Sequence, residues 1–142
     1  MVVAFCGHSR YERVVEDEKK ILEILEKRVG DASVEFFLGE YGDFDKFSYN
    51  CAKKFKNNHV EAKLVFITPY ITVAKHKKDR FDIIIYPELE KIPVQYAILY
   101  RNRWMVDKAD IIIAYVTHKY GGAYTMYRYA KQKNKEIYNI TD

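Results

Sequence analysis

The sequence is poor in the residues that mark disulfide frameworks and membrane spans. Its 142 residues include two cysteines, three prolines and six glycines. Cys6 and Cys51 lie far apart without a CxxC spacing, which favours two free thiols in a reducing compartment. No run approaches the ~20 apolar residues that cross a bilayer, and the first apolar run is too short for a signal peptide. We therefore expect a cytoplasmic protein without a membrane segment.

Familiar catalytic and metal-binding signatures are also missing. The chain has no GxSxG, no P-loop, no HExxH and no paired Cys/His spacing. We therefore expect no metal site and no bound cofactor. The four histidines are scattered, although His8 and His118 each follow a predicted strand, so proton transfer by either one stays open as an alternative.

The composition is that of a globular chain with a slight excess of positive charge. Hydrophobic residues make up 49% and charged residues 31%, which is typical of a folded domain. The net charge of +4 favours an anionic partner. Basic residues are mixed with acidic ones, which argues against an extended nucleic-acid stripe. The length predicts one domain spanning residues 1–142.

Short apolar runs alternate with amphipathic stretches along the chain. Glycine or proline follows several of the runs, and the stretches between them show helical periodicity. An S-x-x-E pattern at Ser9 and Glu12 predicts a capping box for the first helix, and Asp43 predicts a cap for the second. Residues 70–81 give no clear pattern. The predicted strands are 2–6, 34–38, 64–68, 82–86, 111–116 and 136–140, and the predicted helices are 11–29, 44–57, 93–108 and 123–133.

This alternation predicts an α/β fold with a doubly wound, mostly parallel sheet. Right-handed crossovers place helices on both faces, which gives a Rossmann-like three-layer α/β/α domain. In such folds ligands bind beyond the carboxyl ends of the strands.

Glycine-bearing loops follow three of the predicted strands. Gly7, Gly39 and the Gly121-Gly122 pair come just after strands, with His8 and Arg10 beside the first loop. Glycine lets a backbone approach a ligand closely. A helix N-terminus supplies free N–H groups and partial positive charge, which suit phosphate. The loops together predict a site for a phosphorylated ligand.

Arg101 is the second candidate, because it falls on an apolar helical stripe between Ala97 and Met105. An arginine on such a stripe is either paired or directed into a cavity. The alternative is an exposed basic turn around a buried Trp104.

The order of these motifs resembles the SLOG superfamily, a Rossmann-like nucleotide-binding group that includes the LOG phosphoribohydrolases and the DprA/Smf proteins. The YpsA-like (DUF1273-type) proteins are the most similar group. The residues on which this resemblance rests are 7–10, Gly39 with 43–45, 101–107, and Gly121-Gly122 with Thr125. The resemblance implies a pocket for a nucleotide or an ADP-ribose-like compound. The predicted ligand-binding residues are Gly7, His8, Arg10, Gly39, Asp43, Arg101, Arg103, Gly121, Gly122 and Thr125.

One departure from the family pattern concerns catalysis. LOG phosphoribohydrolases carry PGGxGTxxE, whose acidic residue takes part in cleaving the glycosidic bond, and here Arg128 occupies the glutamate position. The sequence therefore favours a sensor or regulatory module that binds without turnover. The alternative is an enzyme that uses Glu40, Asp43 or a histidine, and a weaker alternative is a DprA-like nucleic-acid interaction protein.

Aromatic residues are numerous, with 13 tyrosines and 8 phenylalanines. Tyr96, Tyr100, Tyr127 and Tyr129 fall on predicted helix surfaces, beyond what one small core needs. They predict self-association, most simply as a twofold dimer.

Overall fold

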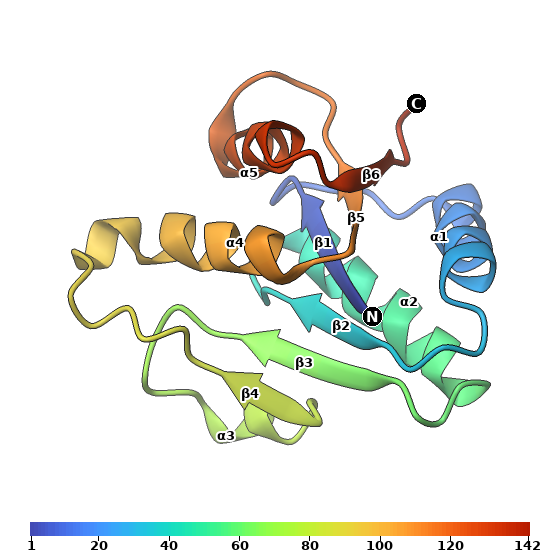
Figure 1. Cartoon of the computed structure of the whole chain (residues 1–142), viewed down its shortest axis with the longest axis horizontal. Helices are drawn as coiled ribbons and strands as arrows, with labels where there is room; N and C mark the ends of the chain where they lie inside the picture. The colour runs from blue at the N-terminus through green and yellow to red at the C-terminus, as the bar shows by residue number, and fades with distance from the viewer.

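Six parallel strands form the central sheet of the protein, which a computed structural model describes over residues 1–142 (Figure 1). The strand order is β4-β3-β2-β1-β5-β6, and every neighbouring pair is parallel. The predicted α/β class, doubly wound sheet and Rossmann-like architecture are therefore confirmed. The strands are β1 (Val2–Gly7), β2 (Glu35–Leu38), β3 (Lys63–Ile67), β4 (Ile83–Ile85), β5 (Ile111–Tyr115) and β6 (Glu136–Asn139).

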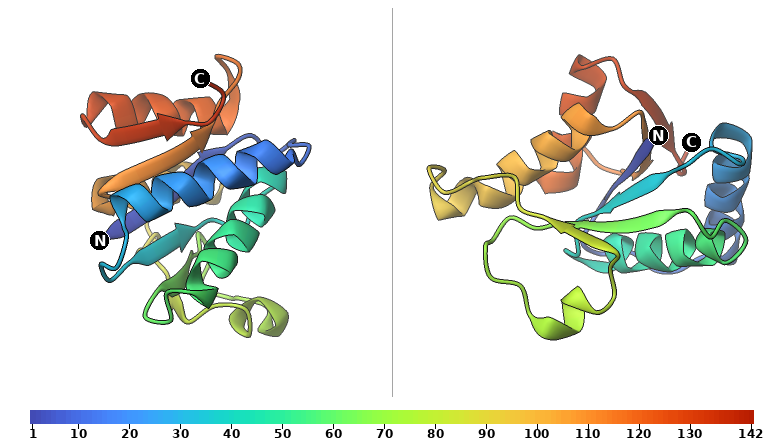
Figure 2. Two further views of the ribbon diagram at one scale, coloured as in Figure 1. Left: turned by 90° about the vertical axis from the view of Figure 1, so that its right-hand side faces the viewer. Right: turned by 60° about the horizontal axis from the view of Figure 1, so that its bottom comes forward.

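Helices cover both faces of the sheet, as the turned views make clear (Figure 2). Helices α1 and α2 contact each other on one face, and α4 and α5 contact each other on the opposite face. A short helix α3 follows β3, and a single 3₁₀ turn η1 leads into α4. The bounds are α1 (Val15–Arg28), α2 (Asp43–Asn57), α3 (Lys75–Lys78), η1 (Val94–Tyr96), α4 (Ala97–Lys108) and α5 (Gly121–Gln132). No helix is long and apolar enough to cross a membrane.

Strand β1 lies at the centre and contributes to two cores. Val3 and Phe5 join the apolar cluster under α1 and α2, while Ala4 and Cys6 join the cluster under α4 and α5. Alternate side chains of a strand point to opposite faces, so a continuous apolar run is what a doubly covered strand requires. From β1 the chain moves outward through β2, β3 and β4, and then returns to the other side of β1 for β5. The strand order thus reverses between β1 and β5.

Two of the predicted helix starts are wrong. Helix α1 begins at Val15 without a side-chain cap, so Ser9 and Glu12 form no capping box. Residues before it stay irregular because the Tyr11 ring packs against aromatic side chains of α2 and β5, and its hydroxyl donates to Asp17 at 2.8 Å. Asp43 is the first residue of α2 rather than its cap, and Gly42 takes the cap position.

Candidate ligand-binding cleft

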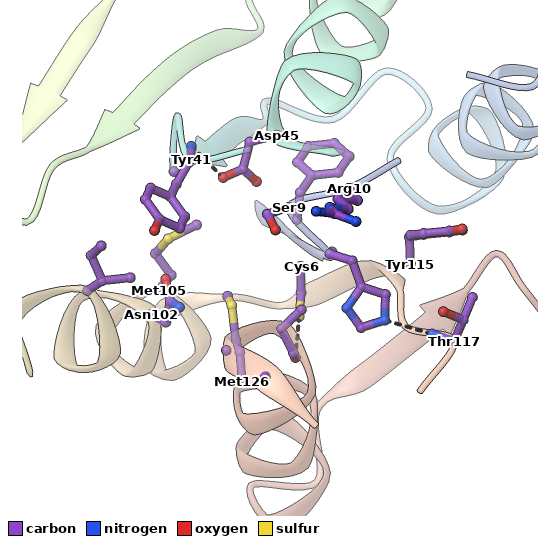
Figure 3. Close-up of a pocket in the computed structure, with 18 of the residues that line it drawn as sticks. Cys6, Ser9, Arg10, Tyr41, Asp45, Asn102, Met105, Tyr115, Thr117 and Met126 are labelled. Carbon is purple, nitrogen blue, oxygen red and sulfur yellow. Dashed lines mark hydrogen bonds between the residues drawn. The ribbon is translucent and has the colours of Figure 1, made fainter. Parts of the chain in front are cut away.

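A cleft of about 590 Å³ opens at the carboxyl ends of β1 and β5, where the strand order reverses. We call it the β1–β5 cleft. Reversal of strand order makes the loops after the two strands diverge, and this crevice is where open parallel sheets bind ligands. Its walls come from the loops after β1, β2 and β5, from Asp45 in the first turn of α2, from α4 between Ile98 and Met105, and from the start of α5 (Figure 3).

Seven of the ten predicted binding residues line the cleft and three do not. The lining residues are Gly7, His8, Arg10, Gly39, Arg101, Gly121 and Gly122. Asp43 is exposed outside the cleft and accepts a hydrogen bond from the Tyr11 backbone N–H. Thr125 is exposed and donates its hydroxyl to the Gly121 carbonyl at 3.0 Å. Arg103 stacks against the rings of Tyr100 and Tyr129, both at 5.4 Å from its guanidinium carbon.

Arg101 is the most deeply buried cation of the chain, with 2% of its surface exposed. Its Nη1 donates to the carbonyls of Gly39 at 2.9 Å and Ile67 at 2.7 Å, and its Nε donates to Asn102 at 2.9 Å. No carboxylate lies within ion-pair distance of the guanidinium. Burial lowers the pKa of Arg101, but an arginine remains charged at neutral pH. The cleft therefore contains a buried positive charge without a contacting counter-ion.

Asp45 lines the same cleft, although it is not among the binding residues that the sequence predicts. Its carboxylate accepts the backbone N–H of Tyr41 at 2.7 Å, as the dashed line in Figure 3 shows. A Cβ added at Gly39 would lie 3.2 Å from both Asp45 Oδ2 and Arg101 Nη2, so the absence of that atom leaves the two side chains room to approach. Burial raises the pKa of Asp45 to about 6, against the opposing effects of the Tyr41 N–H and Arg101.

The raised pKa of Asp45 predicts that Asp45→Asn stabilises the protein at neutral pH. A carboxyl whose pKa is higher in the folded state contributes stability below about pH 4 and loses that contribution as the pH rises to about 6. Asparagine keeps the Tyr41 hydrogen bond without the buried charge. Urea denaturation should therefore give equal free energies of unfolding at pH 4 and a gain of roughly 2 kcal/mol for the variant at pH 7. A difference that does not change with pH would contradict this assignment.

His8 is held as a neutral imidazole on the β5 side of the cleft. The backbone N–H of Thr117 donates to Nε2 of His8 at 2.9 Å, which requires a free lone pair on that nitrogen. Burial and the neighbouring His118 lower the pKa of His8. The rings of His8 and His118 stack at 3.7 Å, and Tyr120 stacks on His118 at 3.8 Å. The stack joins the loops after β1 and β5, while the Thr117 hydrogen bond occupies Nε2 of His8.

The N-terminus of α5 forms the wall opposite Asp45. It has no side-chain cap and no acidic residue in its first turn, whereas α2 begins with Asp43 and Asp45. A Cβ built at Gly121 or Gly122 would meet no atom within 4 Å, so the backbone there is open to the cleft. Cys6 donates its thiol to the Ala123 carbonyl at 3.2 Å and so holds this turn against β1. Free N–H groups on an open helix start form an anion-binding surface.

The cleft has the donors of an anion site and lacks the donors of a metal site. No group of three or more His, Cys, Asp or Glu side chains is arranged to hold a metal ion. Asp45 is the only carboxylate that lines the cleft. Arg128, at the position of the LOG glutamate, is exposed outside the cleft, with its guanidinium 5.9 Å from the Tyr124 ring. The cleft therefore lacks the α5 carboxylate of those hydrolases, and it also lacks the opposing cation that the sequence suggests at that position.

Comparison with known proteins shows relatives at the level of the fold. No family model matches the chain, and neither does any curated protein. Among solved structures, DNA processing protein A from Helicobacter pylori, described for its single-stranded DNA binding mode, has a TM-score of 0.63 at 15% identity over 96% of this chain. DprA from Streptococcus pneumoniae has a TM-score of 0.66 at 12% identity over 95%. The molybdenum cofactor carrier protein from Chlamydomonas reinhardtii has a TM-score of 0.58 at 12% identity over 96%.

The lengths of these relatives differ from that of this chain. The chain spans 63% of the Helicobacter protein, 48% of the Streptococcus protein and 73% of the carrier protein. The likeness is one of fold, and the chain has the Rossmann-like fold of the DprA proteins, as its resemblance to the SLOG superfamily predicts.

Proposed function

We propose that the protein binds a phosphorylated nucleotide or nucleotide-derived ligand in the β1–β5 cleft and acts as a sensor or regulatory module. The observation that carries the proposal is Arg101, a buried cation in the cleft wall without a contacting carboxylate. A buried charge without a contacting partner is costly. Asp45 is near enough to raise the pKa of Arg101 but lies outside ion-pair distance, so a phosphate group would supply the counter-ion that contacts the guanidinium.

The α5 N-terminus supports the same ligand chemistry. Its open glycine backbone and the Arg101 guanidinium both border the cleft, and Arg10 is exposed at its edge. Charge-assisted hydrogen bonds to phosphate from backbone and arginine are the recurring solution for nucleotide phosphates. The molybdenum cofactor carrier is an example of this fold in a protein named for carrying a ligand.

Binding without turnover is the form of the proposal that the cleft chemistry favours. Glycosidic cleavage develops positive charge on the sugar, which a carboxylate stabilises. Glu40, one of the substitutes that the sequence suggests, lies outside the β1–β5 cleft and pairs with Arg80 at 3.0 Å. Loss of one such electrostatic contact costs on the order of a hundredfold in rate.

Incubation with nucleoside monophosphates tests both parts of the proposal. We expect isothermal titration calorimetry to show binding of one or more of them, and chromatography to show no free base above the level without protein. Mass spectrometry of small molecules released from the denatured protein supplies the natural ligand. Release of base at ordinary enzymatic rates would replace the sensor function with an enzymatic one.

The enzymatic alternative has one observation in its favour, which is Asp45. A carboxyl group with a pKa of about 6 in a cleft can act as an acid or a base near neutral pH. Asp45→Asn separates the two functions, because it removes base release by an enzyme but leaves phosphate binding to a sensor intact.

Self-association is a further prediction, and it concerns the start of α4. Val94 and Tyr96 in η1 are 73% and 49% exposed, and Tyr100 one turn later is also exposed. Tyr127 and Tyr129 are covered in part by Lys131 and Lys133. We expect light scattering to give the mass of a dimer at micromolar concentration, and Tyr96→Ser to shift the protein toward monomer. A monomer mass for the unmodified protein up to ~100 μM, a concentration at which even weak interfaces assemble, would contradict the prediction.

A further inference from the structure

A second cleft adjoins the first on the side of β2 and β3. It has a volume of about 310 Å³ and lies beyond the ends of these strands, against the segment 68–74 and Lys77 of α3. Four residues line both clefts: Gly39, Tyr41, Ile98 and Arg101. The two clefts therefore meet along one continuous edge of the sheet.

Arg101 stands at the junction of the two clefts. Nη1 is held by two strand-end carbonyls and Nε by Asn102, so the guanidinium plane is fixed. These bonds leave Nη2 without a hydrogen-bond partner in the protein, at a residue that lines both clefts. A fixed, buried guanidinium with a free N–H is a site for an oxyanion that lies between the clefts.

The lining of the second cleft differs in character from that of the first. Two of its polar side chains are already paired, because the Thr68 hydroxyl bonds to the Tyr70 backbone and Glu40 pairs with Arg80. Lys77 makes no ion pair, and its Nζ lies 5.8 Å from the centre of the Phe66 ring. The remaining surface comes from rings and small apolar side chains, among them Tyr41, Phe66, Tyr70 and Val73. Tyr41 and Tyr70 are exposed even though they border a cleft. The rings of this surface suit a planar ring by stacking, and Lys77 is the one cation that it adds to Arg101.

From this juxtaposition we propose that the ligand is of the dinucleotide type, with two ring-bearing nucleoside units joined by a phosphate linker. One unit occupies the β1–β5 cleft, the other occupies the second cleft, and the linker lies at Arg101. The inference rests on the proposed function, since it assumes that a nucleotide occupies the first cleft, and it adds the class of ligand.

Calorimetry with paired compounds tests the proposal. AMP and GMP are compared with the corresponding dinucleoside diphosphates, and ADP controls for the added phosphate. We expect at least one dinucleoside diphosphate to bind ten-fold or more tightly than its mononucleotide, and ADP to show no comparable gain.

Two variants locate this gain in affinity. Val73→Trp fills the second cleft and should reduce the dinucleotide affinity to that of the mononucleotide, which should itself bind unchanged. Ala74→Trp should also fill the second cleft. It serves if the first variant does not fold, because Ala74 is an exposed residue of the cleft lining. Val60→Trp is the matched control, because Val60 is exposed and lines neither cleft.

The outcomes distinguish failure of the dinucleotide proposal from failure of the proposed function on which it rests. Equal affinities for mono- and dinucleotides, or a gain that survives both tryptophan variants, overturn the dinucleotide proposal and leave nucleotide binding in place. A single-stranded oligonucleotide that binds more tightly than every dinucleotide also overturns it, in favour of a nucleic-acid ligand. Failure of all nucleotides to bind overturns the proposed function itself.

Discussion

Arg101→Gln should reduce nucleotide affinity by at least a hundredfold and destabilise the fold. The change removes the only deeply buried cation of the cleft and the donor to the carbonyls of Gly39 and Ile67. A hydrogen bond to a charged group contributes about 1.5–3 kcal/mol, and a buried carbonyl without a donor costs about 1–3 kcal/mol. We therefore expect a loss of about 2–4 kcal/mol in the free energy of unfolding, measured by urea denaturation, together with the loss of affinity measured by calorimetry.

Arg103→Gln is the matched control for this prediction. Arg103 lies two residues further along α4, outside the cleft, and packs on tyrosine rings. Its replacement should change nucleotide affinity less than twofold. Arg101→Lys keeps the charge and serves if the glutamine variant does not fold, since a lysine lacks the planar fork and should still lose affinity. If Arg103→Gln lowered nucleotide affinity strongly and Arg101→Gln left it unchanged, the proposed function would lose the observation on which it rests.

The arginine pair also shows why a short motif identifies a region better than it identifies a site. Arg101 and Arg103 stand in one segment that resembles the SLOG pattern, yet successive helix residues turn by about 100°. The side chain of Arg103, two residues after Arg101, therefore points away from the cleft. The apolar stripe through Ala97 and Met105 selects Arg101, and of the two interpretations that the sequence leaves open for it, the buried one is correct. Motifs alone point to Asp43 and Thr125, and both lie outside the cleft.

The same stripe argument, applied to α2, would have found Asp45. Ser48 and Ala52, at helical spacings of three and seven residues from it, are both fully buried. An acidic residue on a buried stripe calls for a partner or a cavity, as an arginine does. The proximity of Asp45 to Arg101 across Gly39 could not be predicted in this way, because α2 and α4 lie on opposite faces of the sheet. Only the three-dimensional arrangement brings their ends to one edge.

The strands themselves were predictable to within one or two residues, because buried parallel strands are continuous apolar runs ended by glycine or proline. The start of α1 was not, since Tyr11 is held by long-range aromatic contacts that no local pattern encodes. Local sequence thus identified the strand ends that carry the cleft. The irregular backbone of residues 8–14 depends on side chains from α2 and β5.

Gly122→Val should abolish nucleotide binding and leave the fold intact. A Cβ at Gly122 meets no atom of the protein within 4 Å, and the backbone there does not adopt a positive φ, so valine fits without displacing a neighbour. Gly121 is unsuitable for this test, because its φ of 87° strains any other residue. Valine at the start of the helix also costs only a few tenths of a kcal/mol in propensity. Loss of affinity in the variant therefore reports a clash with the ligand.

The size of the effect follows from the geometry of phosphate on a helix start. Backbone N–H groups bind an oxyanion at about 2.9 Å, a distance at which the added isopropyl group excludes the phosphate. We expect a loss of at least a hundredfold in affinity by calorimetry, with an unchanged melting temperature and circular dichroism spectrum, and a smaller loss for Gly122→Ala. Thr125→Val introduces the same side chain one turn later on α5, outside the cleft, and should leave affinity unchanged. A folded Gly122→Val protein that binds nucleotide as tightly as the original would mean that the phosphate does not lie at the α5 N-terminus, and the cleft would then have to hold its ligand through its arginines, Arg101 and Arg10.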